Sequence, residues 1–194
     1  MENKDNKKRQ PMVLVFAGPN GSGKTTITEN IDVIGEYTNA DALAKYSGMN
    51  DIEAAKEVDR RRYEAIAQKR DFTFETVLSS NYKLDLLKQA KSEGYFIKCF
   101  FILTISPEIN IMRVKARVEQ GGHSVDEEKI VSRFYSSLRN IAELIDICEI
   151  LHIYDNTGQK PVRILRKHKD DITIFPSEYW SEHQILNLIS GDIE

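Results

Sequence analysis

An apolar run followed by a glycine-rich loop near the start of the chain constrains its fold more than any other feature. Residues 12–17, MVLVFA, are long enough for one buried strand, and Gly18–Thr25, GPNGSGKT, matches the pattern G-x-x-x-x-G-K-[ST] at every fixed position. The glycines let backbone N–H groups turn inward around an anion, and a helix that starts near Lys24 adds the positive end of its dipole. The pattern predicts a phosphate-binding loop (P-loop) that holds a nucleoside triphosphate.

The residues of this loop have separate expected roles. We expect Lys24 to reach the β- and γ-phosphates and the Thr25 hydroxyl to coordinate Mg²⁺. The remaining predicted nucleotide-binding residues of the loop are Gly18, Pro19, Asn20, Gly21, Ser22, Gly23 and Thr26. An apolar strand directly before the loop and a helical pattern directly after it are the context that the motif requires.

Segments typical of strands and of helices alternate after the loop. The further expected strands are 37–39, 71–78, 95–105 and 149–154, and the expected helices are 25–34, 51–70, 81–93, 107–120, 124–145 and 176–189. Ser124 and Glu127 have the spacing of a capping box for the helix at 124–145. Residues 161–165 and 171–175 are typical of a late hairpin. The alternation predicts an α/β fold of the P-loop NTPase class, with a five-stranded parallel sheet and helices on both faces.

The length and the charge of the chain exclude several classes of protein. A length of 194 residues predicts one domain, at residues 11–194, after a flexible, solvated tail at residues 1–10. The net charge of −3 argues against a general nucleic-acid surface. No apolar run approaches the length of a membrane span. The two cysteines lie in apolar segments, as buried thiols do in a reducing cytosol, so we expect a cytoplasmic protein without a membrane partner.

Acidic and amide residues follow several of the predicted strands. In parallel sheets, ligands bind outside the carboxyl ends of the strands, so the P-loop, Asp41, Glu75 and Asn156 are expected to face one cleft. Asp41 is the candidate general base that accepts the proton of an acceptor hydroxyl. The alternative is that Asp41 is a helix N-cap for the segment that follows it, a position that Asp favours.

Glu75 is a carboxylate in an otherwise apolar and hydroxylated strand. Two roles suit it: holding Mg²⁺, directly or through water, or accepting a hydrogen bond from a substrate hydroxyl. The alternative is an ordinary solvent-facing strand residue. The sequence does not decide between these roles.

Three arginines surround a predicted glycine turn. Arg113 and Arg117 are four residues apart on one helix, and Arg133 follows the Gly121–Gly122 break. Two helices joined in this way could form a lid whose guanidinium groups clamp phosphate oxygens. The alternative is ordinary surface charge on the helices, with Glu119 and Glu127 as partners, and it suits Arg113 better than Arg117 or Arg133.

The other charged and titratable groups carry weaker signals. The run Arg60–Arg62 is typical of a solvated helix face, with contact to nucleic acid as the minority interpretation. His123 is an exposed loop residue by its position next to glycines, and no cluster of residues has the spacing of a zinc site.

Several motifs in order resemble the zeta-toxin family of P-loop kinases. They are Ala17–Thr26, Asn39-Ala40-Asp41, Phe74–Ser79, the segment from Arg113 to Val125 with Arg117 and Gly121-Gly122-His123, and Tyr154-Asp155-Asn156. The resemblance spans residues 12 to 156. It implies a kinase fold with a helical lid that uses ATP and Mg²⁺. In characterised zeta toxins, the phosphorylated group is the 3′-hydroxyl of UDP-N-acetylglucosamine.

The same resemblance assigns roles to residues. It implies that Asp41 is the catalytic base, and that Lys24, Arg117 and Arg133 hold the phosphates. It implies that Glu75 faces the substrate; Glu75 and Thr25 are also the candidate metal ligands. We add Asn39, Thr76 and Arg113 as substrate-binding residues and Asn156 as a nucleotide-binding residue. The family also implies a small helical antitoxin that blocks the nucleotide site.

The sequence thus favours a kinase that phosphorylates a hydroxyl of a small metabolite. One alternative is a kinase of nucleosides or of nucleic-acid ends, which only the run Arg60–Arg62 and the basic tail support. A second alternative is a nucleotide-binding switch or partner protein that transfers no phosphate to a metabolite.

Overall fold

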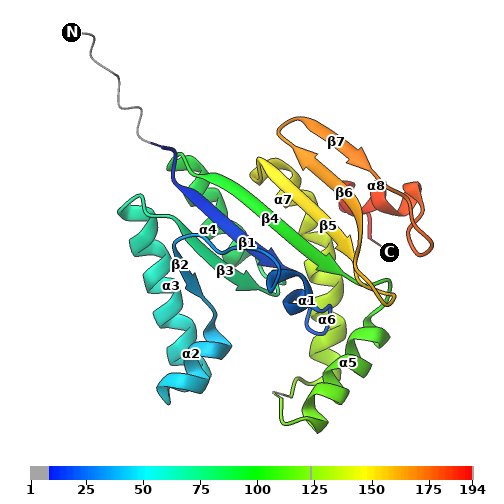
Figure 1. Ribbon diagram of the computed structural model, residues 1–194, viewed down its shortest axis with the longest axis horizontal. Coiled ribbons are helices and arrows are strands. Elements are labelled where there is room, and N and C mark those ends of the chain that lie inside the picture. Colours follow the sequence, from blue (N-terminus) through cyan, green and yellow to red (C-terminus); the bar gives the residue numbers. More distant parts are fainter. Residues whose placement is uncertain (1–8, 123, 194) are drawn as a thin grey trace.

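A seven-stranded sheet forms the centre of the fold (Figure 1). The computed structural model describes residues 9–122 and 124–193, so residues 1–8 of the predicted tail lie outside the described part. The strands are β1 (Met12–Ala17), β2 (Glu36–Thr38), β3 (Phe72–Thr76), β4 (Phe96–Leu103), β5 (Ile150–Asp155), β6 (Val162–His168) and β7 (Asp171–Ile174). The helices are α1 (Lys24–Thr28), α2 (Ala40–Ser47), α3 (Asp51–Ala67), α4 (Asn81–Ser92), α5 (Pro107–Glu119), α6 (Glu127–Arg139), α7 (Ile141–Ile147) and α8 (Glu182–Ser190).

The strand order is β2-β3-β1-β4-β5-β6-β7. The first five strands in this order are parallel, and they are the five that the sequence predicts. The predicted count of five is nevertheless wrong for the whole sheet. The late hairpin does not stand apart from it, because β6 pairs antiparallel with β5 and β7 pairs antiparallel with β6.

Helices cover the two faces of the sheet unequally. The larger core packs α3, α4, α6, α7 and α8 against one face, and its strand residues include Val13, Phe74 and Phe101. The smaller core on the other face centres on Phe16, Phe100 and Ile27 of α1. The P-loop follows β1, from which the chain runs first to β2 and β3 on one side and then to β4 and β5 on the other. This is the switch point at which α/β sheets bind ligands.

Three helical segments differ from the sequence prediction. Helix α1 ends at Thr28 rather than near residue 34, and α2 was not predicted as a helix. The predicted helix at 124–145 is two helices, because the chain breaks at Asn140, whose side chain donates to the Leu78 carbonyl oxygen at 2.8 Å. Its cap is Asp126, which accepts from the Lys129 N–H, so the predicted capping box at Ser124 is wrong.

The only tryptophan of the chain, Trp180, is buried just before α8. It lines a cavity of about 330 Å³ together with the start of α5 and the middle of α6, including Pro107, Phe134 and Leu138. The base of the predicted lid helices therefore rests against the C-terminal segment of the chain.

Within the described residues, none of the helices combines the length and the apolar character that a membrane span requires.

His152 of β5 is expected to make the fold acid-sensitive. Its ring stacks on Phe100 with the centroids 5.1 Å apart, and burial, with Arg163 and Lys98 nearby, lowers its pKa to about 4. The unfolded chain takes up a proton at this histidine near pH 6.5, whereas the folded chain does not until about pH 4. Stability is therefore lost as the pH falls through this window.

We expect His152→Phe to reduce the difference in unfolding free energy between pH 7 and pH 5, measured by urea denaturation. His183→Phe, at an exposed site on α8, is the control and should leave that difference as in the wild type. An unchanged difference in His152→Phe would contradict the prediction.

Candidate active site

The P-loop is packed tightly between neighbouring segments. Gly21 has a φ of +76°, and a Cβ atom there would lie 2.4 Å from the Asn110 carbonyl oxygen at the start of α5. Gly23 has a φ of +83°, and its Cβ atom would lie 2.2 Å from Nδ2 of Asn156. Only glycine suits both positions, because other residues meet backbone strain and a steric clash at once.

Asn156 fastens the loop to the end of β5. Its Nδ2 donates to the Ser22 carbonyl oxygen at 2.8 Å, and its side chain is buried. The Gly18 N–H donates to the Thr76 carbonyl oxygen at 3.2 Å, which joins the other side of the loop to β3. The residues that the sequence places after β1, β3 and β5 thus meet around one loop.

Lys24 lies buried inside the P-loop. Its Nζ donates to the carbonyl oxygens of Gly18 and Pro19, at 2.9 and 3.3 Å. It also lies 3.8 Å from Oε1 of Glu75. Burial lowers the pKa of Lys24, and the carboxylates of Glu75 and Asp41 act in the opposite direction. A phosphate group would supply the anionic partner that favours the charged ammonium.

Glu75 is surrounded by hydrogen-bond donors. Its Oε2 accepts from the Tyr37 hydroxyl at 3.1 Å and from Asn39 Nδ2 at 3.4 Å. Tyr37 was not predicted as a site residue, although its place two residues before Asn39 in a strand puts both on one face. These contacts hold Glu75 between Lys24 and the end of β2.

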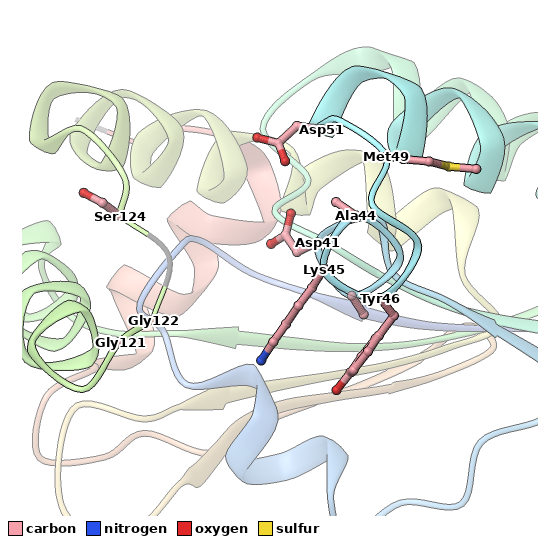
Figure 2. Close-up of a pocket in the computed structure, with 10 residues that line it drawn as sticks. Asp41, Ala44, Lys45, Tyr46, Met49, Asp51, Gly121, Gly122 and Ser124 are labelled. Carbon is pink, nitrogen blue, oxygen red and sulfur yellow. The ribbon is translucent and has the colours of Figure 1, made fainter.

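Asp41 lines a cavity of about 760 Å³ (Figure 2). It is the second residue of α2, whose cap is Asn39: the Asn39 side chain accepts from the Ala42 N–H at 3.2 Å. Asp41 is therefore not the helix cap. Figure 2 shows α2 with Lys45 and Tyr46 on one side of the cavity and the segment with Gly121, Gly122 and Ser124 on the other.

The three arginines of the predicted lid all reach the P-loop region. Arg113 and Arg117 line a cavity of about 200 Å³ with Gly21, Lys24, Thr25 and Glu75. Arg117 also acts electrostatically on Lys24. Arg133 lies on α6, and its Nη1 donates to Oδ1 of Asn20 at 3.4 Å. Glu127 was one of the two acidic residues expected to pair with these arginines if they were ordinary surface charge. It pairs with Lys115 instead, at 2.7 Å.

Several buried side-chain donors lack partners among the described residues, and two of them suit phosphate binding at the P-loop. These two are the Ser22 hydroxyl and Nη1 of Arg113. Nη2 of Arg113 donates to the Asn156 carbonyl oxygen at 2.8 Å, which holds the guanidinium against the loop. A buried donor without an acceptor costs about 1–3 kcal/mol. Both groups therefore fit a site built for phosphate oxygens.

Two cavities thus hold part of the predicted site. The smaller one is lined by Gly21, Gly23, Lys24, Thr25, Glu75, Arg113 and Arg117, and the larger one by Asp41. Asn39 lines a third cavity, of about 180 Å³. His123 lies outside the described residues. In the described part of the chain, no group of three or more His, Cys, Asp or Glu side chains could hold a metal ion. Arg62, expected on a solvated helix face, is instead buried.

A family model and one sequence relative match much of the chain. The model of the zeta toxin family matches residues 34–168, a range that begins after the P-loop and contains Asp41, Glu75 and the three arginines. An uncharacterized protein of Haemophilus influenzae is 31% identical over 131 residues, which cover 64% of this chain and 94% of that protein.

Solved structures share the fold at low sequence identity. The PezAT chromosomal toxin–antitoxin system of Streptococcus pneumoniae aligns with a TM-score of 0.61 and 20% identity, over 97% of this chain and 88% of that chain. The complex AvrRxo1-ORF1:AvrRxo1-ORF2 with sulphate ions gives a TM-score of 0.66 and 15% identity, over 96% of this chain. This chain spans 66% of that one, which has also been solved with ATP.

Proposed function

Because this chain belongs to the zeta toxin family, we propose that it transfers the γ-phosphoryl group of ATP to a hydroxyl group of a small metabolite. The family match supports a P-loop phosphotransferase of the kinase type. The observation that carries the choice of acceptor is the pair of cavities. One is bounded by Lys24 and Thr25 and suits phosphates, and the other is bounded by Asp41 and has a volume within the usual range for small ligands.

On this proposal, the P-loop side binds the donor. The backbone N–H groups of the loop and the ammonium of Lys24 hold the β- and γ-phosphates, with the free Nη1 of Arg113 and the Ser22 hydroxyl as further donors. Arg117 and Arg133 stabilise the charge that develops on the transferred group. The Thr25 hydroxyl would hold Mg²⁺, which when bound neutralises phosphate charge.

The acceptor binds in the larger cavity with its hydroxyl toward Asp41. As the hydroxyl oxygen bonds to the γ-phosphorus, the bond from that phosphorus to the bridging oxygen of ATP breaks, and Asp41 accepts the hydroxyl proton. On this proposal, Glu75, which lines the smaller cavity, and Asn39, which donates to it, bind a polar group of the acceptor next to the transferred phosphate. Thr76, the last residue of β3, is proposed to bind the acceptor beside Glu75.

The direct test is transfer from γ-labelled ATP in the presence of Mg²⁺. UDP-N-acetylglucosamine is the first acceptor, followed by a panel of sugars, nucleosides and other alcohols. We expect a phosphorylated product with at least one of them. Failure with UDP-N-acetylglucosamine alone would remove the zeta-toxin substrate, and failure with the whole panel would remove the metabolite-kinase function.

A partner protein follows from the same family membership. The PezAT system is named as a toxin–antitoxin system, and we propose that a small helical antitoxin likewise covers the nucleotide site of this chain. Co-purification of such a protein with loss of ATP binding is the expected result.

A further inference from the structure

Arg62 differs sharply from the two arginines that precede it on α3. The side chains of Arg60 and Arg61 are 55% and 39% exposed and pair with Glu57, whereas that of Arg62 is 2% exposed. Removing a guanidinium from water costs several kcal/mol unless hydrogen bonds replace the lost hydration. The contacts that repay this penalty therefore indicate what the residue does.

Two of the three hydrogen bonds of Arg62 go to the last residue of β2. Nε of Arg62 donates to the Thr38 hydroxyl at 2.8 Å, and Nη2 donates to the Thr38 carbonyl oxygen at 3.1 Å. Nη1 donates to Asp59 at 2.9 Å, and the guanidinium lies over the Phe74 ring, 4.6 Å from its centroid. Burial lowers the pKa of Arg62, and the carboxylate of Asp59 acts in the opposite direction.

β2 needs such a clamp because it is short and at the edge of the sheet. It has three residues and one neighbouring strand, β3. Thr38 is three residues before Asp41, and Asn39 between them both caps α2 and donates to Glu75. We therefore expect a shift of Thr38 to move the carboxylates of Asp41 and Glu75.

We propose that Arg62 is a positioning residue that fixes the end of β2, and with it Asp41 and Glu75, in the geometry required for phosphoryl transfer. This proposal rests on the proposed kinase function for its effect on turnover. It assigns Arg62 no contact with ATP, because its partners lie on β2, α3 and β3. It is distinct from the arginines of α5 and α6, which reach the P-loop.

The test compares Arg62→Met, Arg62→Lys and the exposed control Arg60→Met in the full chain. Methionine fills similar space without a donor, and lysine restores one charged donor nitrogen in place of three. A displacement of about 1 Å at a reacting group can lower turnover by about 100-fold, so we expect a loss of this order in kcat for Arg62→Met. The Kd for ATP should stay at the wild-type value. Lysine should restore part of kcat, and Arg60→Met should match the wild type.

A second measurement separates this proposal from the proposed function. Hydrogen exchange of the backbone amides of residues 38–45 should be faster in Arg62→Met than in Arg60→Met, whether or not an acceptor is known. Equal exchange in the two variants would overturn the clamp, even if the wild type phosphorylates no tested acceptor. Loss of ATP binding and of cooperative unfolding together with turnover would show a general structural role and would also overturn it.

Discussion

Asp41→Asn is expected to lower phosphoryl transfer by about 100- to 10,000-fold, the usual contribution of a general base. Asparagine has nearly the same shape but cannot accept the hydroxyl proton. ATP should still bind, because the P-loop, Lys24 and Arg113 line the separate, smaller cavity. The measurements are the Kd for ATP and kcat with an acceptor that the transfer assay identifies.

The fold should tolerate this change. Asp41 is exposed in the first turn of α2, where its charge contributes about 0.3–1 kcal/mol through the helix dipole. We therefore expect Asp41→Asn to keep the unfolding free energy of the wild type while it loses phosphoryl transfer. If instead Asp41→Asn kept the full biological effect of the chain in cells, the nucleotide-binding switch would replace the kinase as the better explanation.

Lys24→Met is expected to remove most ATP binding and to lower transfer by about 100- to 1,000-fold, as the loss of one preorganised charged donor does elsewhere. In the free chain, the ammonium is buried and its pKa is lowered by that burial. Methionine occupies similar space without a charge to desolvate. The nucleotide-free variant should therefore be at least as stable as the wild type.

Thermal unfolding with and without ATP tests this prediction. ATP at about 100 times its Kd stabilises a protein by about 2.7 kcal/mol, and Lys24→Met should lack this gain. The matched control is Lys45→Met, since Lys45 lines the larger cavity and should leave the gain unchanged. A full ATP-dependent gain in Lys24→Met would exclude Lys24 from the phosphate site.

The parts of the site that follow strands could be predicted from the sequence. A glycine pattern fixes the P-loop locally, and the rule for parallel sheets brings Glu75 and Asn156 to the same edge. Both contact the P-loop, through Lys24 and Ser22. Asp41 required more, because its place depends on α2, a helix of eight residues that buries none of its side chains and was not predicted.

Arg62 shows why other features were missed. Its charge and its two arginine neighbours indicate a solvated face, yet it lies four residues after the buried Val58 and before the buried Ile66. The helical spacing therefore predicts a buried position at residue 62, whereas the arginine there predicts an exposed one. The contacts with Thr38 and Phe74 in the structure show that the position is buried. The pairing of β6 with β5 was also missed, although the two strands are consecutive, because the late hairpin was predicted without a partner strand in the sheet.

The single tryptophan gives this chain an intrinsic optical reporter. Trp180 lies at the junction of the C-terminal segment with α5 and α6, and its buried Nε1 has no partner among the described residues. Any movement of α5 or α6 relative to α8 changes the polarity around this indole. Fluorescence emission can therefore separate nucleotide binding that moves the arginine-bearing helices from binding that leaves them in place, without labels or added tryptophans.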